Sequence, residues 1–86
     1  MVTPSPEALR VLRILRERAT DGYTVSSKTS LDTQKLYEAV RELAAEDLVS
    51  VKGVLSPEYI SEAYLSIPPD ALGYADMLLG QIRYKR

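Results

Sequence analysis

The sequence contains no cysteine, histidine, tryptophan or phenylalanine. Without cysteine, the chain cannot form a disulfide, a thiolate nucleophile or a cysteine-ligated zinc site, which excludes a disulfide-stabilised secreted scaffold. Without histidine, it lacks the commonest metal ligand and the side chain most used for proton transfer near neutral pH. These absences favour a cytoplasmic protein that is not an enzyme and holds no cofactor.

Long apolar segments are also missing. No stretch approaches the roughly 18 consecutive apolar residues of a membrane span, and the N-terminal MVTPSP has no basic flank followed by an apolar run. We therefore expect no membrane association. With 86 residues, of which 45% are hydrophobic and 27% charged, the composition predicts a single small globular domain over residues 1–86.

The net charge is only −1, but the charges are unevenly distributed. Residues 1–28 carry five basic and three acidic side chains, whereas residues 29–82 carry three basic and nine acidic ones. Arg83, Lys85 and Arg86 make the tail basic. Because DNA affinity depends mainly on neutralising phosphates with lysine and arginine, the acidic middle of the chain counts against DNA binding.

The first helix is predicted to start at Ser5-Pro6-Glu7. Serine is a favoured N-cap, proline suits the first helical position, and glutamate suits the positive end of the helix dipole. Helical spacing gives this helix one apolar face, made of Ala8, Val11, Leu12, Leu15 and Ala19. Asp21-Gly22 is expected to end it. Thr24-Val25-Ser26 then predicts a brief extended segment, and residues 27–30 leave room for about one helical turn.

Asp32 is expected to cap a second clear helix. Its core-facing residues have helical spacing and are Leu36, Ala39, Val40 and Leu43. Gln34, Lys35, Glu38, Arg41, Glu42 and Ala45 are expected to point outward. After this helix, Val49 and Val51 alternate with Ser50 and Lys52, a pattern typical of a half-buried strand over residues 48–52.

Residues 53–67 are compatible with two structures. Ser56-Pro57-Glu58 repeats the cap pattern of the first helix, and the apolar residues after it have helical spacing. The same residues also alternate as in a strand, with Ser56-Pro57-Glu58 in the turn of a hairpin. We favour the hairpin, because strand 48–52 needs a partner and Pro68-Pro69 ends a strand more readily than it continues a helix.

A last helix is expected after that proline pair. It has a wide apolar stripe made of Ala71, Leu72, Ala75, Leu78, Leu79 and Ile82. Gly73 and Gly80 lie on nearly the same line of this helix and would allow the close approach of another backbone.

This order of elements resembles a winged helix-turn-helix domain. The segment KLYEAVRELAAEDLV, residues 35–49, is similar to the recognition helix and first wing strand of the PadR and MarR classes of bacterial regulators. AYLSIPPD, residues 63–70, resembles the second wing strand and the start of the closing helix. The resemblance implies an α+β fold with three helices and a β-hairpin wing, here with a shortened helix 2. The chain also has Asp47 where these families commonly have glycine, so a left-handed helix C-cap is not expected there.

The resemblance implies a transcriptional regulator or accessory factor that places a helix in the major groove of double-stranded DNA. The residues that would face bases and phosphates are Thr33, Gln34, Lys35, Glu38 and Arg41. Lys52 and the turn at residues 53–58 would form the wing, and Lys28 would add a phosphate contact. Without DNA, Lys35 and Arg41 would belong to a solvated face on which Glu38 and Glu42 flank Arg41.

Two other classes of function compete with DNA binding. In the first, the scaffold is a protein-interaction module whose closing helix contacts a partner or a second copy, through Leu72, Ala75, Leu79 and Ile82. The six tyrosines suit such an interface. The second class is an enzyme, with Ser26-Ser27-Lys28 or the pair Asp70 and Asp76 as candidates. Neither set has a third group to activate it, so we expect no catalysis.

Overall fold

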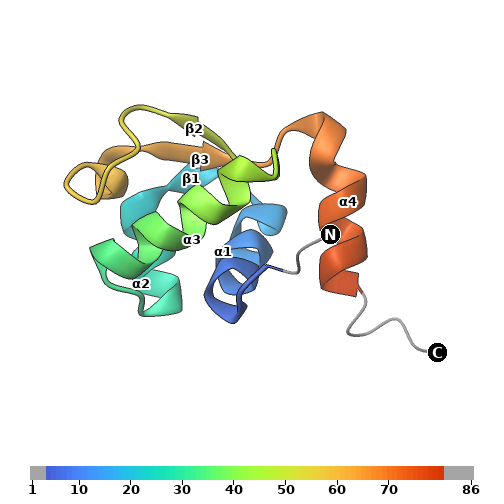
Figure 1. Ribbon diagram of the computed structural model, residues 1–86, viewed down its shortest axis with the longest axis horizontal. Coiled ribbons are helices and arrows are strands. Elements are labelled where there is room, and N and C mark those ends of the chain that lie inside the picture. Colours follow the sequence, from blue (N-terminus) through green and yellow to red (C-terminus); the bar gives the residue numbers. More distant parts are fainter. Residues whose placement is uncertain (1–3, 81–86) are drawn as a thin grey trace.

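The computed structural model describes residues 4–80 and is a small α+β domain (Figure 1). Within that range it has four α-helices, two short 3₁₀ turns and a three-stranded antiparallel sheet. In chain order these are α1 (Pro6–Glu17), β1 (Thr20–Asp21), α2 (Gly22–Thr29), α3 (Thr33–Ala45), β2 (Ser50–Lys52), η1 (Ile60–Glu62), β3 (Tyr64–Ser66), η2 (Pro69–Ala71) and α4 (Leu72–Gly80). The sheet covers one side of α1, α2 and α3, and α4 lies at the far end against α1 (Figure 1).

Helix α1 begins as the sequence predicts but ends earlier. The Ser5 hydroxyl accepts a hydrogen bond from the Ala8 backbone N–H at 3.2 Å, and Pro6 occupies the first turn. Arg18 is already extended, with φ −169° and ψ 148°, so the helix stops at Glu17. Asp21 does not end α1, as the sequence suggested, because it caps the next helix.

The prediction of an extended Thr24-Val25-Ser26 is wrong. The Asp21 carboxylate accepts the Thr24 backbone N–H at 2.8 Å and starts α2, whose eight residues form about two turns. Val25 is fully buried in the core. Local β-branched residues suggested a strand, but the Asp21 cap and the burial of Val25 stabilise a helix here. Helix 2 is therefore longer than the single turn that the sequence predicted.

Gly22 lies where α2 passes close to η1. Its N–H donates to the Ala63 carbonyl at 2.9 Å. A Cβ added to Gly22 would lie 1.9 Å from the carbonyl oxygen of Ile60. Backbone atoms cannot yield as a flexible side chain can, so this crossing requires glycine.

Helix α3 begins as predicted: the Asp32 carboxylate accepts the Lys35 backbone N–H at 2.8 Å. The predicted apolar face is buried, with Leu36, Ala39, Val40 and Leu43 at most 2% exposed. The expectation about Asp47 is wrong, because Asp47 is left-handed, with φ 59°. Its N–H donates to the Ala44 carbonyl at 3.0 Å, and the Leu48 N–H donates to the Leu43 carbonyl at 2.9 Å. This is a Schellman C-cap, in which aspartate takes the place usually held by glycine.

The hairpin that the sequence favoured is confirmed, with shorter strands than expected. β2 and β3 are antiparallel, with Val51 opposite Leu65 and Lys52 opposite Tyr64. β1 pairs with the other edge of β3, so the order in the sheet is β1-β3-β2. The residues between the paired strands, 53–63, form an irregular segment that ends in η1 and that we call the β2–β3 loop. Ile60 is fully buried in the core, which ties this loop to the domain.

Helix α4 and the preceding η2 pack on the core through Ala75 and Ala71, with Tyr74, Leu78 and Leu79 packed partly against it. Ala75 is fully buried and Ala71 is 9% exposed, while Leu72, Leu78 and Leu79 are half-buried. Arg16 on α1 binds Asp76 on α4 through two hydrogen bonds, Nε to Oδ1 at 2.5 Å and Nη2 to Oδ2 at 3.1 Å. Nothing lies within 4 Å of a Cβ added at Gly73 or Gly80. Among residues 4–80, no helix is both long and apolar enough to cross a bilayer.

Candidate functional site

The outer face of α3 carries five of the residues that the sequence assigned to a DNA interface. Thr33, Gln34, Lys35, Glu38 and Arg41 are all exposed. In Figure 1, α3 crosses the front of the domain with the β2–β3 loop beside it, and α3 contacts η1 at the end of that loop. The core-facing stripe of α3 fixes this orientation, because burying Leu36, Val40 and Leu43 turns the opposite side to solvent.

Arg41 lies beside an aromatic ring. The central carbon of its guanidinium lies 6.0 Å from the centroid of the Tyr37 ring, at the outer limit of a cation–π contact. The alternative suggested by the sequence, with Glu38 and Glu42 flanking Arg41, finds no support in residues 4–80, where Arg41 has no ion pair. Glu38 instead accepts a hydrogen bond from the Gln34 amide at 2.9 Å.

Glu42 does not point outward as the sequence predicted. Its carboxylate turns toward α1 and accepts two hydrogen bonds from Ser5, from the backbone N–H at 2.8 Å and from the hydroxyl at 2.9 Å. The side chain of Glu42 is therefore committed to the start of α1. No signal in the sequence could have found this contact, because the two residues are 37 positions apart.

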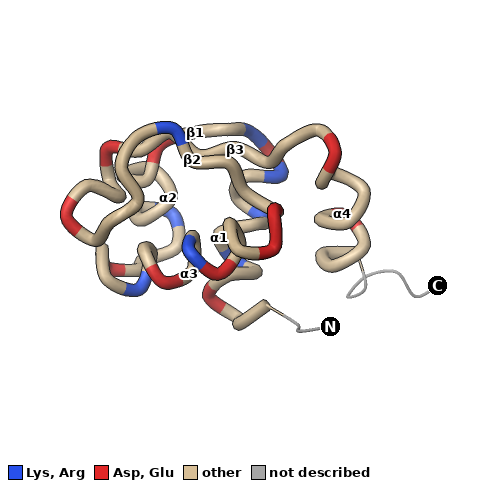
Figure 2. Tube along the Cα trace, turned by 45° about the horizontal axis from the view of Figure 1, so that its top comes forward, with Lys and Arg blue, Asp and Glu red and all other residues tan. Residues whose placement is uncertain are grey.

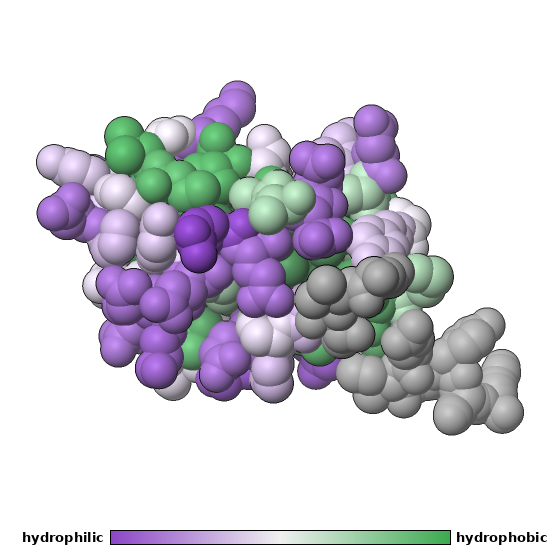
Figure 3. All heavy atoms as spheres, viewed as in Figure 1, coloured by the Kyte–Doolittle hydropathy of each residue, from purple (hydrophilic) through white to green (hydrophobic). Residues whose placement is uncertain are grey.

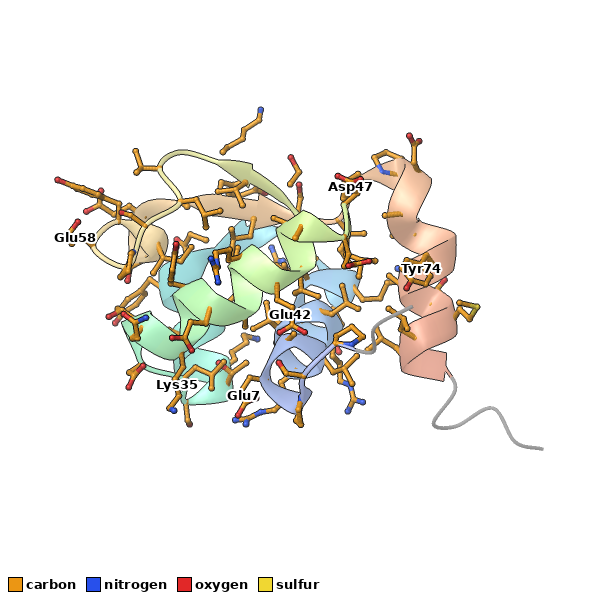
Figure 4. All side chains as sticks on the ribbon, viewed as in Figure 1. Glu7, Lys35, Glu42, Asp47, Glu58 and Tyr74 are labelled. Atoms are coloured by element: carbon orange, nitrogen blue, oxygen red, sulfur yellow. The ribbon has the colours of Figure 1, made fainter. Side chains whose placement is uncertain are left out.

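Lys35 lies at the edge of the exposed face of α3 that borders α1. It lines a hollow of about 170 Å³ together with Ser5, Glu7, Glu38, Ala39 and Glu42. Figure 4 shows Lys35 and Glu7 near each other at the N-terminal end of α3, with Glu42 farther along the helix. The two basic residues of α3 therefore lie in different parts of its exposed face, Lys35 at the edge toward α1 and Arg41 beside Tyr37.

The β2–β3 loop and its strands present Lys52 together with exposed apolar side chains. Lys52 is exposed on β2, opposite Tyr64. Val54 is 58% exposed, Tyr59 51% and Tyr64 48%. The hydrophobic surface over this loop is visible at the upper left of Figure 3. Val54 lies in the turn at residues 53–58 that the sequence assigned to the wing, but its exposed apolar side chain was not singled out.

Lys28 does not join the face of α3. It lines a separate hollow of about 270 Å³ with Ile14, Glu17, Arg18, Thr20 and Thr24, formed by α1, β1 and α2. Asp21 caps α2 beside this hollow. The Thr24 backbone N–H, and then its hydroxyl, stabilise the charged form of Asp21 and hold the pKa of its carboxyl below the usual value.

Carboxylates dominate the opposite end of α3. Glu46 and Asp47 line a hollow of about 500 Å³ with Pro68, with Asp70 and Ala71 of η2, and with Tyr74 of α4. Asp47 and Tyr74 face this region in Figure 4. Along the trace of residues 4–80, basic and acidic residues are interleaved and no broad basic face is visible (Figure 2). A polyanion would be repelled at this end of α3.

The residues assigned to a partner interface on α4 differ in exposure. Leu72 and Leu79 are half-buried, whereas Ala75 is fully buried against the chain's own core and presents no surface to a partner. Ala71 of η2, four residues before Ala75, is buried in the same core. Ile82 lies outside the described residues. Met77, which the sequence analysis did not select, is 49% exposed.

Within residues 4–80, no group of three or more acidic side chains could hold a metal ion. Comparisons of the chain with models of protein families, with curated proteins and with solved structures gave no significant match.

Proposed function

We propose that this chain is a winged helix that binds double-stranded DNA through α3 and the β2–β3 loop, as a transcriptional regulator or accessory factor. The chain order α1-β1-α2-α3-β2-β3 with sheet order β1-β3-β2 supports this scaffold. Two predictions from the sequence differed from the usual winged-helix pattern: a shortened second helix and the absence of a left-handed C-cap at Asp47. With two turns in α2 and a left-handed Asp47, neither departure remains.

The main support for the proposal is that the outward side of α3 is exposed to solvent. A major groove about 12 Å wide admits an α-helix, and α3 turns its exposed side outward with no other element over it (Figure 1). Gln34 and Arg41 supply side chains of the types that read bases or bind phosphate. Residues 33–47 contain four acidic side chains. One of them, Glu42, is bound to Ser5 and is therefore directed away from the proposed DNA surface.

The charge of this face predicts modest, salt-sensitive binding. Three cations are available along it: Lys35, Arg41 and Lys52. If each neutralises one phosphate, the logarithm of the binding constant falls with the logarithm of salt concentration with a slope of about −3. Such binding needs low salt to be measured on a mixed sequence.

The test is fluorescence anisotropy of a labelled mixed-sequence duplex titrated with the chain. Changing Lys35 and Arg41 together to alanine is expected to weaken binding and to reduce the salt slope by about 2. Arg13→Ala is the control, because Arg13 is an exposed cation on α1 outside the proposed surface. Absence of binding at low salt, or equal losses in both variants, contradicts the proposal.

A second candidate is contact with a protein partner through α4. It is favoured by Met77, which is 49% exposed, and by Leu72, which is half-buried, whereas the half-buried Leu79 packs in part against the chain's own core. Homodimerisation is the simplest form of this candidate. A monomeric mass in solution at high protein concentration would contradict the homodimer.

A further inference from the structure

The hollow between α1 and α2 combines free positive charge with a partly apolar lining. Arg18 follows the last residue of α1, Thr20 lies on β1, and Thr24 and Lys28 lie one turn apart on α2. Ile14 is half-buried and contributes the apolar part of the lining. The volume, about 270 Å³, is near the lower end of the range of small-molecule pockets, about 300–1,000 Å³.

The two cations of this hollow are unpaired. Among residues 4–80, neither the Arg18 guanidinium nor the Lys28 ammonium has an ion-pair or hydrogen-bond partner. Two arginines of α1 are engaged: Arg16 binds Asp76, and Arg10 donates to the Thr29 carbonyl at the end of α2. Two free cations that converge on one hollow attract an anion more strongly than either does alone.

Acidic groups limit the charge that the hollow can accept. Glu17 is part of the lining, and the Asp21 carboxylate lies beside it, but Asp21 is engaged by Thr24. Because the Thr24 N–H already donates to Asp21, it is not available to a ligand at the start of α2. Recognition therefore depends on the side chains of Arg18 and Lys28, with the Thr20 hydroxyl as a further donor.

We propose that this hollow binds a small phosphorylated molecule, with its phosphoryl group between Arg18 and Lys28 and its carbon skeleton against Ile14. Arginine binds phosphoryl oxygens through a planar fork and lysine through a point charge. The site shares no residue with the hollow at Lys35, and it does not depend on the DNA-binding proposal. A DNA backbone offers the same phosphoryl chemistry, so the test must separate the two sources.

The test is an NMR titration of the isotope-labelled full chain with glycerol phosphate and with inorganic phosphate, against sodium chloride at matched ionic strength. We expect saturable amide shifts confined to residues 14–28. Changing Arg18 and Lys28 together to glutamine should weaken binding roughly tenfold or more. Lys28→Glu, which reverses one of the two charges, should weaken binding at least as much as the double glutamine change, and Arg13→Gln should bind as the original chain does.

Three results would overturn the proposal. The first is a response no larger than that to chloride, and the second is a response that persists in the Arg18 and Lys28 double variant. The third is a double variant that loses binding to a DNA duplex while the original chain shows no saturable response to either phosphate compound. In that case the two cations contact a DNA backbone rather than a small molecule.

Discussion

The Glu42 carboxylate on α3 accepts hydrogen bonds from both the backbone N–H and the hydroxyl of Ser5, at 2.8 and 2.9 Å. The same Ser5 hydroxyl oxygen accepts the Ala8 N–H at the start of α1. One side chain on α3 therefore holds the residue that caps α1, and the packing of α1 on α3 includes this polar contact.

Glu42→Ala is expected to lower the free energy of unfolding by about 2 kcal/mol, because hydrogen bonds to a charged, partly buried group are lost. The measurement is urea unfolding followed by circular dichroism. Glu46→Ala, an exposed change near the end of the same helix, should alter stability by no more than about 0.5 kcal/mol. Equal effects of the two substitutions would show that the contact with Ser5 contributes nothing.

Gly22→Ala is expected to destabilise the domain by at least about 3 kcal/mol, since the new Cβ meets backbone atoms of η1 and α2 must move away. Gly73→Ala is the matched control, because its Cβ meets nothing within 4 Å. In an exposed helix this control should stabilise the protein by about 0.5 kcal/mol. Thermal unfolding of both variants tests the pair, and a Gly22→Ala protein as stable as the original would refute the close crossing of α2 and η1.

Asp21 predicts a pH dependence of stability. Its pKa in the folded protein lies below the unfolded value because the Thr24 N–H and hydroxyl favour the carboxylate. The folded state therefore binds this proton less readily, so the stabilisation is fully present above the unfolded pKa, about 3.9, and is lost as pH falls through the folded pKa. Asparagine caps a helix comparably but does not titrate. As the pH falls below about 4, the original chain should lose stability relative to Asp21→Asn. Its unfolding midpoint should therefore fall more than that of the variant. A constant difference would contradict the assignment.

The ion pair between Arg16 on α1 and Asp76 on α4 is expected to reduce local opening of α4. Both side chains are exposed, 42% and 54%, so we expect a local effect on α4 rather than a large change in global stability. Asp76→Asn should accelerate amide hydrogen exchange in α4 and leave α3 unchanged. High salt should accelerate α4 exchange in the original chain and have less effect in the variant. If salt acts equally on both proteins, the pair does not hold the helix.

Local signals in the sequence predicted the two main helices well. The caps at Ser5 and Asp32 and the apolar spacing of α1 and α3 depend on residues within one or two turns, and the structure confirms them. Asp21-Gly22 was misassigned although the signal was local. Aspartate followed by glycine resembles a helix end, but the carboxylate accepts the N–H three residues later and begins a helix.

Other features could not be predicted because they depend on distant residues. The need for glycine at position 22 arises from the Ile60 carbonyl, and the orientation of Glu42 arises from Ser5. The stripe on α4 was correctly identified as apolar, but its period alone does not say which part faces inward. Packing on α1 decides this, and it buries Ala75 while leaving Met77 exposed.

The most direct test of the proposed function is an NMR footprint, in which a mixed-sequence duplex is titrated into the isotope-labelled chain at low salt. We expect shifts at residues 33–41 of α3 and at residues 52–59 of β2 and the β2–β3 loop, which reverse as salt is raised. Residues 70–80 should be unaffected, because Glu46, Asp47 and Asp70 repel DNA at that end. Shifts confined to α4, or no shifts at all, would contradict DNA binding through α3.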